Sequence, residues 1–389
     1  MRRTLESAQW GLFCTSSWTW CIGMYLPFIM LRLWGWPGFW AFFVPNVLGC
    51  ALFGFVLDAD RSRRVVAQLG WACAWFGAVT VAYQCWFAGW AAQSYGLDPA
   101  FGATGTVDAA GAARAVASVG VPLVLAAAGA LLAARGDAFW RTAGTAVTML
   151  SGLVVLLPGG VAPGIAGGAT EAGATGAALE PQLDLLRLGF AFPTIAAGFL
   201  LSPYLDLTFH RAAQQAPSPR IAFLTFGLAF AAMLLLVASF HDPATGAPRV
   251  GPALLVLWGV QLVFTVGAHA RELFNGPANA RVPLPVTGVL VLAALALAWP
   301  GQLFGIGEAL RPGEPTYLGF LGAYGLVFPV LVMLERRPVP RALTAAIIVV
   351  GAACYLLGAW EFMTWLMPVP ILAAAVASRV TSARRPAAR

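Results

Sequence analysis

Two apolar stretches of the chain are interrupted by glycine and proline and carry polar side chains beside the interruption. In the stretch from 183 to 211, Gly198 and Pro203 lead into a polar exit that includes Tyr204 and Asp206. Proline lacks a backbone N–H and clashes with the preceding turn, so the sequence predicts a kink or break here. Inside a bilayer, freed backbone groups are tolerated only where protein or a wet cavity satisfies them. Such a break favours a solute site, although proline and glycine are also generally commoner in membrane helices.

The first apolar stretch, from 9 to 33, has a similar character. A run of hydroxyl side chains ending at Thr19 precedes Gly23 and Pro27. Backbone groups and half-helix dipoles at such breaks bind polar solutes without a buried charge, so we place the substrate at residues 19–24 and 197–201. The predicted substrate contacts are Ser17, Thr19, Trp20, Gly23, Asn46, Tyr83, Gln84, Gly198, Phe199, Ser202 and Tyr204. For the polar and aromatic members, packing or hydrogen bonding to a neighbouring helix is the alternative role.

Ionisable side chains deep in a membrane are costly and are candidates for function by default. Asp206 is the main candidate, and the alternative is an interfacial carboxylate paired with Arg211 or His210. Gln261 and Thr265, in the eighth apolar stretch, complete the residues proposed for ion binding or gating. No charged residue or histidine lies near the centre of any predicted span, which argues against a proton relay and against a strongly charged substrate. The sequence suggests no catalytic residue, no metal ligand and no cofactor.

The composition is that of a polytopic membrane protein whose main partner is the lipid bilayer. Of 389 residues, 60% are hydrophobic and only 10% are charged, whereas about a quarter are charged in soluble domains. The net charge of +7 comes entirely from arginine and is a topology signal, not an indication of nucleic-acid binding. The six cysteines show no CxxC spacing, so neither a metal site nor a disulfide framework is indicated.

Hydropathy predicts an all-α fold with about twelve transmembrane helices. The expected spans are 9–33, 37–57, 66–93, 114–134, 142–164, 183–209, 221–240, 251–270, 283–300, 316–334, 341–359 and 362–379. This count places 18 of the 23 arginines on the side of the N-terminus and 5 on the other. The positive-inside rule therefore predicts cytoplasmic N- and C-termini, in the cytoplasmic (inner) membrane.

The two interrupted stretches lie five spans apart and resemble each other. The segment from Gly23 to Pro27 resembles that from Gly198 to Pro203, with one extra residue before the second proline. An odd offset inserts the two copies in opposite orientations, which is typical of inverted repeats in transporters. The expected organisation is a first repeat over 1–165, a second over 183–335, two additional helices over 341–379 and an arginine-rich cytoplasmic tail over 380–389.

The order of these features resembles the sodium:solute symporters. The resemblance rests on the first interrupted helix, its Trp- and Gly-containing link, the apolar second helix and an Arg-rich loop after Asp58. It continues in the second repeat from Pro203 to Arg211. It implies the leucine-transporter fold, with two inverted five-helix repeats. In that family a sodium ion uses adjacent hydroxyls of the eighth helix, where this chain offers Gln261 and Thr265 but no hydroxyl pair, which argues against sodium coupling.

Three functions remain open at this point. The leading hypothesis is a secondary transporter, a symporter-like permease that moves a small polar neutral or zwitterionic solute by alternating access. A non-transporting sensor or scaffold of the same fold is the second. The third is a membrane enzyme acting on a lipid-linked substrate, with Asp98 or Asp108 as its base.

Overall fold

The computed structural model is almost entirely helical. It describes residues 1–95, 109–154, 183–277, 310–335 and 337–383, with positions 279, 287, 288, 290, 291 and 293. The first half contains α1 (Arg2–Trp18), α2 (Cys21–Val56), α3 (Ala59–Tyr95), α4 (Ala109–Ala133) and α5 (Asp137–Leu153). The first predicted span is divided between α1 and the start of α2, the rest of α2 covers the second, and α3, α4 and α5 cover the next three. The span expected over 142–164 runs beyond the described residues.

The second half starts with α6 (Leu185–Leu201), the 3-10 turn η3 (Ser202–Leu205), α7 (Leu207–Gln215) and α8 (Pro219–Ser239). A hairpin of β1 (His241–Asp242) and β2 (Ala247–Pro248) leads to α9 (Pro252–Asn275). Then come α11 (Glu314–Gly322), the π-helical turn η5 (Ala323–Val327), α12 (Phe328–Leu334), α13 (Arg341–Trp360), the 3-10 turn η6 (Thr364–Leu366) and α14 (Val369–Ala383). The span expected over 283–300 lies mostly outside the described residues, and the one expected over 362–379 becomes helical only at Val369.

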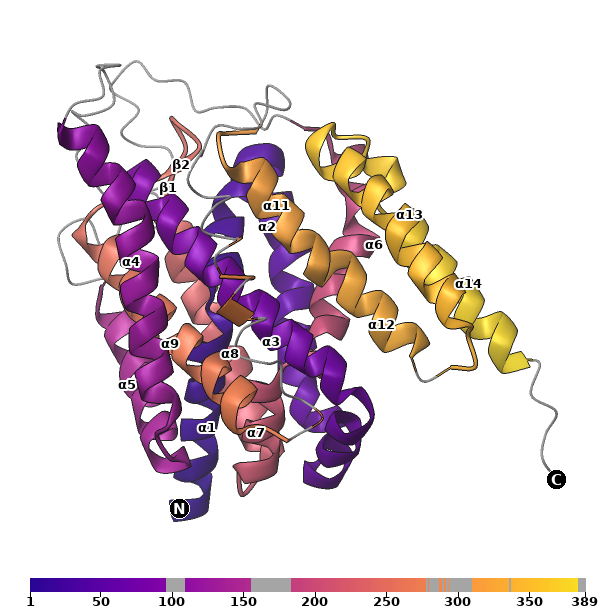
Figure 1. The fold of residues 1–389 in the computed structure, drawn as a ribbon, viewed down its shortest axis with the longest axis horizontal. Coiled ribbons are helices and arrows are strands. Elements are labelled where there is room, and N and C mark those ends of the chain that lie inside the picture. Colours follow the sequence, from indigo (N-terminus) through magenta and orange to yellow (C-terminus); the bar gives the residue numbers. More distant parts are fainter. Residues whose placement is uncertain are drawn as a thin grey trace.

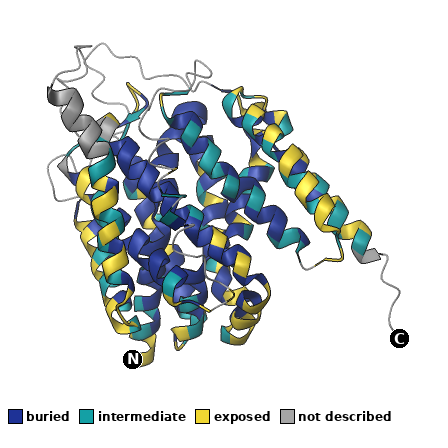
Figure 2. Cartoon of the chain, in the orientation of Figure 1, coloured by how far each residue is buried: buried dark blue, intermediate teal, exposed yellow. Residues whose placement is uncertain are grey.

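The helices form a bundle (Figure 1). Among the described residues, eight helices are long and apolar enough to cross a membrane. Buried residues concentrate in the middle of the bundle, and α13 and α14 lie beside it with much of their surface exposed (Figure 2). Large apolar side chains point outward, among them Leu131, Leu228 and Val349 at 78%, 69% and 70% exposure. Lipid is the environment in which such outward faces are stable.

The first break lies earlier in the chain than Gly23 and Pro27 indicate. α1 ends at Trp18, Trp20 has extended backbone angles, and α2 begins at Cys21. α2 then continues through Pro27 without interruption until Gly35, whose φ of 62° turns the chain between the first and second predicted spans. The expected interruption at Gly23 and Pro27 is therefore wrong by a few residues, because a proline inside a membrane helix removes one donor without necessarily ending the helix.

The second break lies where the sequence predicts it. α6 runs through Pro193 and ends at Leu201, and Pro203 occupies the first turn of η3, where its missing N–H is not needed. Asp206 then leaves helical geometry, with φ −79° and ψ 111°, and caps the start of α7. The predicted break near Pro203 is confirmed.

Close contact between α2 and α6 depends on the absence of a side chain at Gly49. A Cβ atom there would lie 2.9 Å from the Leu200 Cα, closer than real Cβ atoms approach backbone. We expect Gly49→Ala to destabilise the fold by about 1–3 kcal/mol, because the helices must separate to admit the methyl group. Melting temperatures of the purified protein measure this. Gly152→Ala is the matched control, since nothing lies within 4 Å of its added Cβ, and equal losses in both variants would contradict the prediction.

Candidate functional site

The backbone groups freed at the first break find partners on other helices. The Cys21 N–H donates to Gln84 Oε1 of α3 at 3.1 Å, and the Tyr317 hydroxyl of α11 donates to the Cys21 carbonyl at 3.0 Å. On the other side of the break, the Thr265 hydroxyl of α9 donates to the Ser16 carbonyl at 3.2 Å. These hydrogen bonds pair the backbone groups at the break, as is required of buried N–H and carbonyl groups.

The second break is tied to the first through hydroxyl groups. Ser17, near the end of α1, is hydrogen-bonded to the Thr208 hydroxyl at 3.0 Å. The backbone N–H and the hydroxyl of Thr208 both donate to Asp206 Oδ1, at 2.7 and 2.8 Å. Ser202 donates to the Tyr324 carbonyl at 2.8 Å, which holds η3 against η5. The structure therefore brings Ser17, predicted as a substrate contact, next to Asp206, predicted for ion binding.

Aromatic rings surround the two breaks. The rings of Trp20 and Tyr324 meet edge to face, with centroids 4.6 Å apart, and Trp18 lies 4.9 Å from Phe209 of α7. Trp18 Nε1 donates to Asn46 Oδ1 at 2.9 Å. Rings in these arrangements exclude water and hold the non-helical backbone in place.

Asp206 is enclosed by protein. It has no solvent exposure, and neither Arg211 nor His210 forms an ion pair with it. The reason is that Asp206 ends the buried turn η3 and caps α7, which points the carboxylate inward. His269 of α9 is also buried, with 1% exposure, although it lies at the end of the predicted span 251–270 and not near its centre.

A network of charges joins three helices at the end of the bundle where α1 begins. Arg211 of α7 pairs with Glu272 of α9 and, at 2.7 Å, with Asp137 at the start of α5. Arg271 also contacts Asp137, at 2.8 Å. Partial burial would raise the pKa of Asp137, but the guanidinium groups of Arg211 and Arg271 hold that pKa below its ordinary value. We call these four residues the inner network.

A buried ion pair lies at the opposite end, between Arg32 of α2 and Glu314 at the start of α11. Their side chains are 4% and 1% exposed. The Tyr25 hydroxyl donates to Glu314 Oε1 at 3.2 Å, and the Arg311 N–H donates to Oε2 at 2.8 Å. Sequence spacing does not reveal this pair, which we call the outer pair, because the two residues are 282 positions apart. The only signal was an arginine at the end of the first predicted span.

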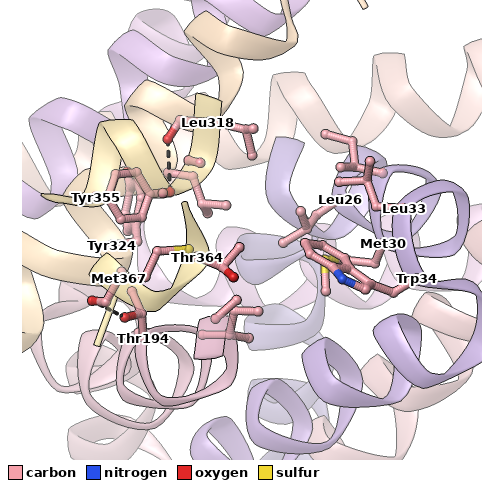
Figure 3. Close-up of a pocket in the computed structure, with 18 of the residues that line it drawn as sticks. Leu26, Met30, Leu33, Trp34, Thr194, Leu318, Tyr324, Tyr355, Thr364 and Met367 are labelled. Carbon is pink, nitrogen blue, oxygen red and sulfur yellow. Dashed lines mark hydrogen bonds between the residues drawn. The ribbon is translucent and has the colours of Figure 1, made fainter. Parts of the chain in front are cut away.

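Several predicted residues have other surroundings. Gln261 donates to Ser151 of α5 at 2.8 Å. Gly198 and Phe199 line an apolar cavity of about 70 Å³ between α2, α6, α11 and α13. Figure 3 shows this cavity, with Leu26, Met30 and Trp34 facing Thr194, Tyr355 and Met367 across it.

The two predicted tyrosines contact other parts of the bundle. The Tyr83 hydroxyl donates to the Tyr317 carbonyl at 3.0 Å. Tyr204 stacks near Phe53, and its carbonyl lies 3.0 Å from His210 Nε2.

Three buried polar atoms around the breaks have no hydrogen-bond partner among the described residues. They are Gln84 Nε2, His269 Nε2 and Asp206 Oδ2. Gln84 binds the first break through its other amide atom, and the His269 ring lies 6.2 Å from that of Trp20. Such unpaired groups are unusual in folded interiors and often mark function. Within the described ranges, no group of three or more His, Cys, Asp or Glu residues is arranged to hold a metal ion.

Comparison with models of known protein families, with curated proteins and with solved structures finds no match for the chain. The function must therefore be argued from the site itself. Asp98 and Asp108, the bases considered for a membrane enzyme, lie outside the described residues.

Gln84 is the residue whose loss should damage the first break most directly. We expect Gln84→Met to destabilise the protein by about 1–3 kcal/mol, because the Cys21 N–H is left buried without an acceptor. The melting temperature measures the effect. Gln215→Met, at an exposed position of α7, is the control, and equal stability of the Gln84 variant and the parent would show that another group accepts this bond.

The hairpin beside the outer pair should respond to pH through His241. Burial lowers the pKa of His241 to about 4 from 6.5, and its ring stacks on Phe28 with centroids 6.5 Å apart. Between these two values the unfolded chain binds a proton that the folded chain does not, so folding stability should fall as pH decreases from 6.5 to 4.

His241→Phe keeps an aromatic ring against Phe28 and should remove this part of the pH dependence. Melting temperatures of the parent and the variant across that pH range provide the measurement. An unchanged slope in the variant would assign the pH dependence to another group.

Proposed function

We propose that the chain is a secondary transporter of the cytoplasmic membrane that moves a small polar neutral or zwitterionic solute by alternating access. The observation that carries this proposal is the pair of facing helix breaks with unpaired polar atoms beside them. Gln84 Nε2 and His269 Nε2 are buried next to the first break, and a polar solute would satisfy them. Neutral amide and imidazole groups suit a solute without strong net charge.

The packing of the helices supports two inverted five-helix repeats, over 1–165 and 183–335. If the second repeat is displaced by five spans, the first span is equivalent to the sixth, and the second span is equivalent to the seventh. A contact between the first and seventh spans is then equivalent to a contact between the sixth and second spans. Both contacts occur, as α1 against α8 and α6 against α2. Likewise α1 packs against α5, and α6 packs against η5 and α12 of the tenth span. The third and eighth spans, α3 and α9, pack against each other, as a twofold relation requires.

The charges at the two ends support alternating access. The outer pair closes one end, and the inner network closes the other. Separating a buried ion pair loses the attraction of the charges but lets water solvate both, so opening one end has a limited cost. The solute site between the breaks would then face one side at a time.

The leucine-transporter fold remains the architecture that the sequence resemblance implies, and it is part of this proposal. Thr265 of α9 donates to the Ser16 carbonyl near the first break, so the eighth span contacts the first where that resemblance expects an ion. A second adjacent hydroxyl is still missing from α9, and we do not include sodium as the coupling ion.

Opposite changes in accessibility at the two ends would test the proposal. Single cysteines are introduced at Gln214, which lines a pocket of about 110 Å³ beside the inner network, and at Pro243, in a pocket beside Arg32. The purified protein is screened by thermal shift against amino acids, polyols and sugars, because a solute that binds the folded state raises the melting temperature. With the stabilising solute, we expect thiol labelling to rise at one position and fall at the other.

The parent chain, whose native cysteines are buried except for the half-buried Cys354, provides the background labelling rate. Labelling that rises or falls at both positions together would contradict alternating access. Absence of any stabilising solute, with no uptake of these solutes into proteoliposomes, would favour the sensor or scaffold function.

A further inference from the structure

Asp206 is a completely buried carboxyl group with one oxygen bound and one oxygen unpaired. Oδ1 accepts both hydrogen bonds from Thr208, whereas Oδ2 has no partner among the described residues. The residue occupies the extended position between η3 and α7, where the second helix break lies. A buried polar atom without a partner at such a position needs an explanation.

The basic side chains that follow Asp206 in the sequence have other partners. Arg211, five residues further on, is engaged in the inner network. His210 Nδ1 lies 2.9 Å from the Ser62 hydroxyl, and its Nε2 lies at the Tyr204 carbonyl. None of the ion pairs formed by the described residues includes Asp206.

The ionisable groups that face Asp206 from α1, α2 and η5 are ordinarily neutral. They are the thiols of Cys14 on α1 and Cys50 on α2, and the phenol of Tyr324 on η5. On α9, which also packs against α7, His269 lies against Trp20, and the charged residues belong to the inner network. The donors of Thr208 at the start of α7 favour an ionised carboxylate, but it would be desolvated and without a cationic side chain in an ion pair, so burial favours the carboxylic acid.

We propose that Asp206 binds a proton in this closed conformation and that its protonation couples opening of the bundle to a proton gradient. The inference deepens the transporter function proposed above, and its coupling step rests on that function. A proton from water on one side binds Oδ2 when the site opens to that side. After the conformational change the same O–H bond breaks, and the proton leaves to water on the other side. The carboxyl group ends the cycle as it began.

The contacts of Asp206 explain how one proton would act on both breaks. Its partner Thr208 is hydrogen-bonded to Ser17, near the end of α1, so α7 and α1 meet at this point. Ionisation of Asp206 requires water. A pocket of about 110 Å³ lined by Leu207, His210 and the inner network residues Arg211 and Glu272 lies beside α7, next in the chain to Asp206, and is the side from which water would enter when α7 separates. Protonation therefore favours the closed bundle, and ionisation favours separation of α7 from its neighbours.

A metal cation is less suitable than a proton at this position. Hard cations take several oxygen ligands, whereas two thiols face Asp206 and its hydroxyl neighbour Thr208 already donates to it. The proposal therefore commits to the proton, and a sodium requirement is an outcome that overturns it.

The first test is the infrared spectrum of the purified full-length protein at neutral pH. A protonated carboxylic acid has a carbonyl band distinct from that of a carboxylate. We expect such a band in the parent protein, its loss in Asp206→Asn, and its retention in Glu314→Gln. The Glu314 variant is the matched control because that buried carboxylate has a cationic partner, Arg32. Absence of the band from the parent protein overturns the proposal.

The second test measures the effect of the proton on stability. Asparagine at 206 keeps an oxygen to accept from Thr208 but cannot ionise. In the pH range in which Asp206 keeps its proton in the closed parent protein and loses it in the unfolded chain, unfolding releases one proton. The ratio of folded to unfolded protein should therefore fall about tenfold for each pH unit as pH rises. Asp206→Asn should lack this decrease. If the variant does not fold, thiol labelling of the native Cys14 and Cys50 in the parent protein is measured across the same pH range instead. The labelling rates are divided by that of Cys85, which lies in another hydrophobic cluster. Labelling that does not increase with pH relative to Cys85 overturns the proposal.

The third test uses proteoliposomes with a trapped pH indicator, to which the same amino acids, polyols and sugars are added. Solute entry that acidifies the lumen in the parent protein but not in Asp206→Asn supports proton coupling. Uptake that requires sodium, or that is unaffected by an imposed pH gradient, overturns the coupling and leaves the transporter function intact. An intact infrared band without uptake of any solute would instead overturn the transporter function.

Discussion

The structure depends on the requirement that every backbone group freed at a helix break be satisfied inside the bundle. At the first break, the acceptor for the Cys21 N–H comes from α3, and the donor to its carbonyl comes from α11. Because these partners belong to different helices, forming the break also fixes how the helices pack around it. Without water in the surrounding bilayer, the Cys21 N–H must find its acceptor within the protein. The polar interior is thus a consequence of the interruption between α1 and α2.

The charged side chains in the bundle follow the same requirement that buried polar groups be paired. The outer pair and the inner network lie near the ends, where opening would let water replace the protein partners. Between them, Gln84, His269 and Asp206 each keep one polar atom unpaired. The paired charges lie near the two ends of the bundle, and the unpaired polar atoms lie between them. This arrangement suits a protein that must hold a polar cargo away from both aqueous sides.

The sequence predicted the elements better than their contacts. Proline at 203 indicated the second break because proline fits the first turn of a new helical segment and not the interior of the previous one. The same reasoning failed at Pro27, since the partners that stabilise the actual break at Thr19 and Trp20 include Gln84, 63 positions from Cys21. The outer pair was missed for the same reason. Burial of Asp206 was equally invisible, because the groups that cover it come from α1, α2 and η5. Side-chain partners set by tertiary packing cannot be obtained from local spacing.

The apolar cavity indicates which part of the bundle has room to move. It lies beside Gly198 of α6, close to Gly325 of η5 and Gly358 of α13. Well-packed interiors resist displacement, so a helix moves most easily toward unfilled space. α6 is bounded at one end by the break over Ser202 to Asp206, where non-helical backbone can absorb changes in φ and ψ. A tilt of α6 into the cavity would change its distance from α2, which carries Arg32 of the outer pair. The non-helical backbone at Asp206, the unfilled space and the outer pair therefore lie on connected elements.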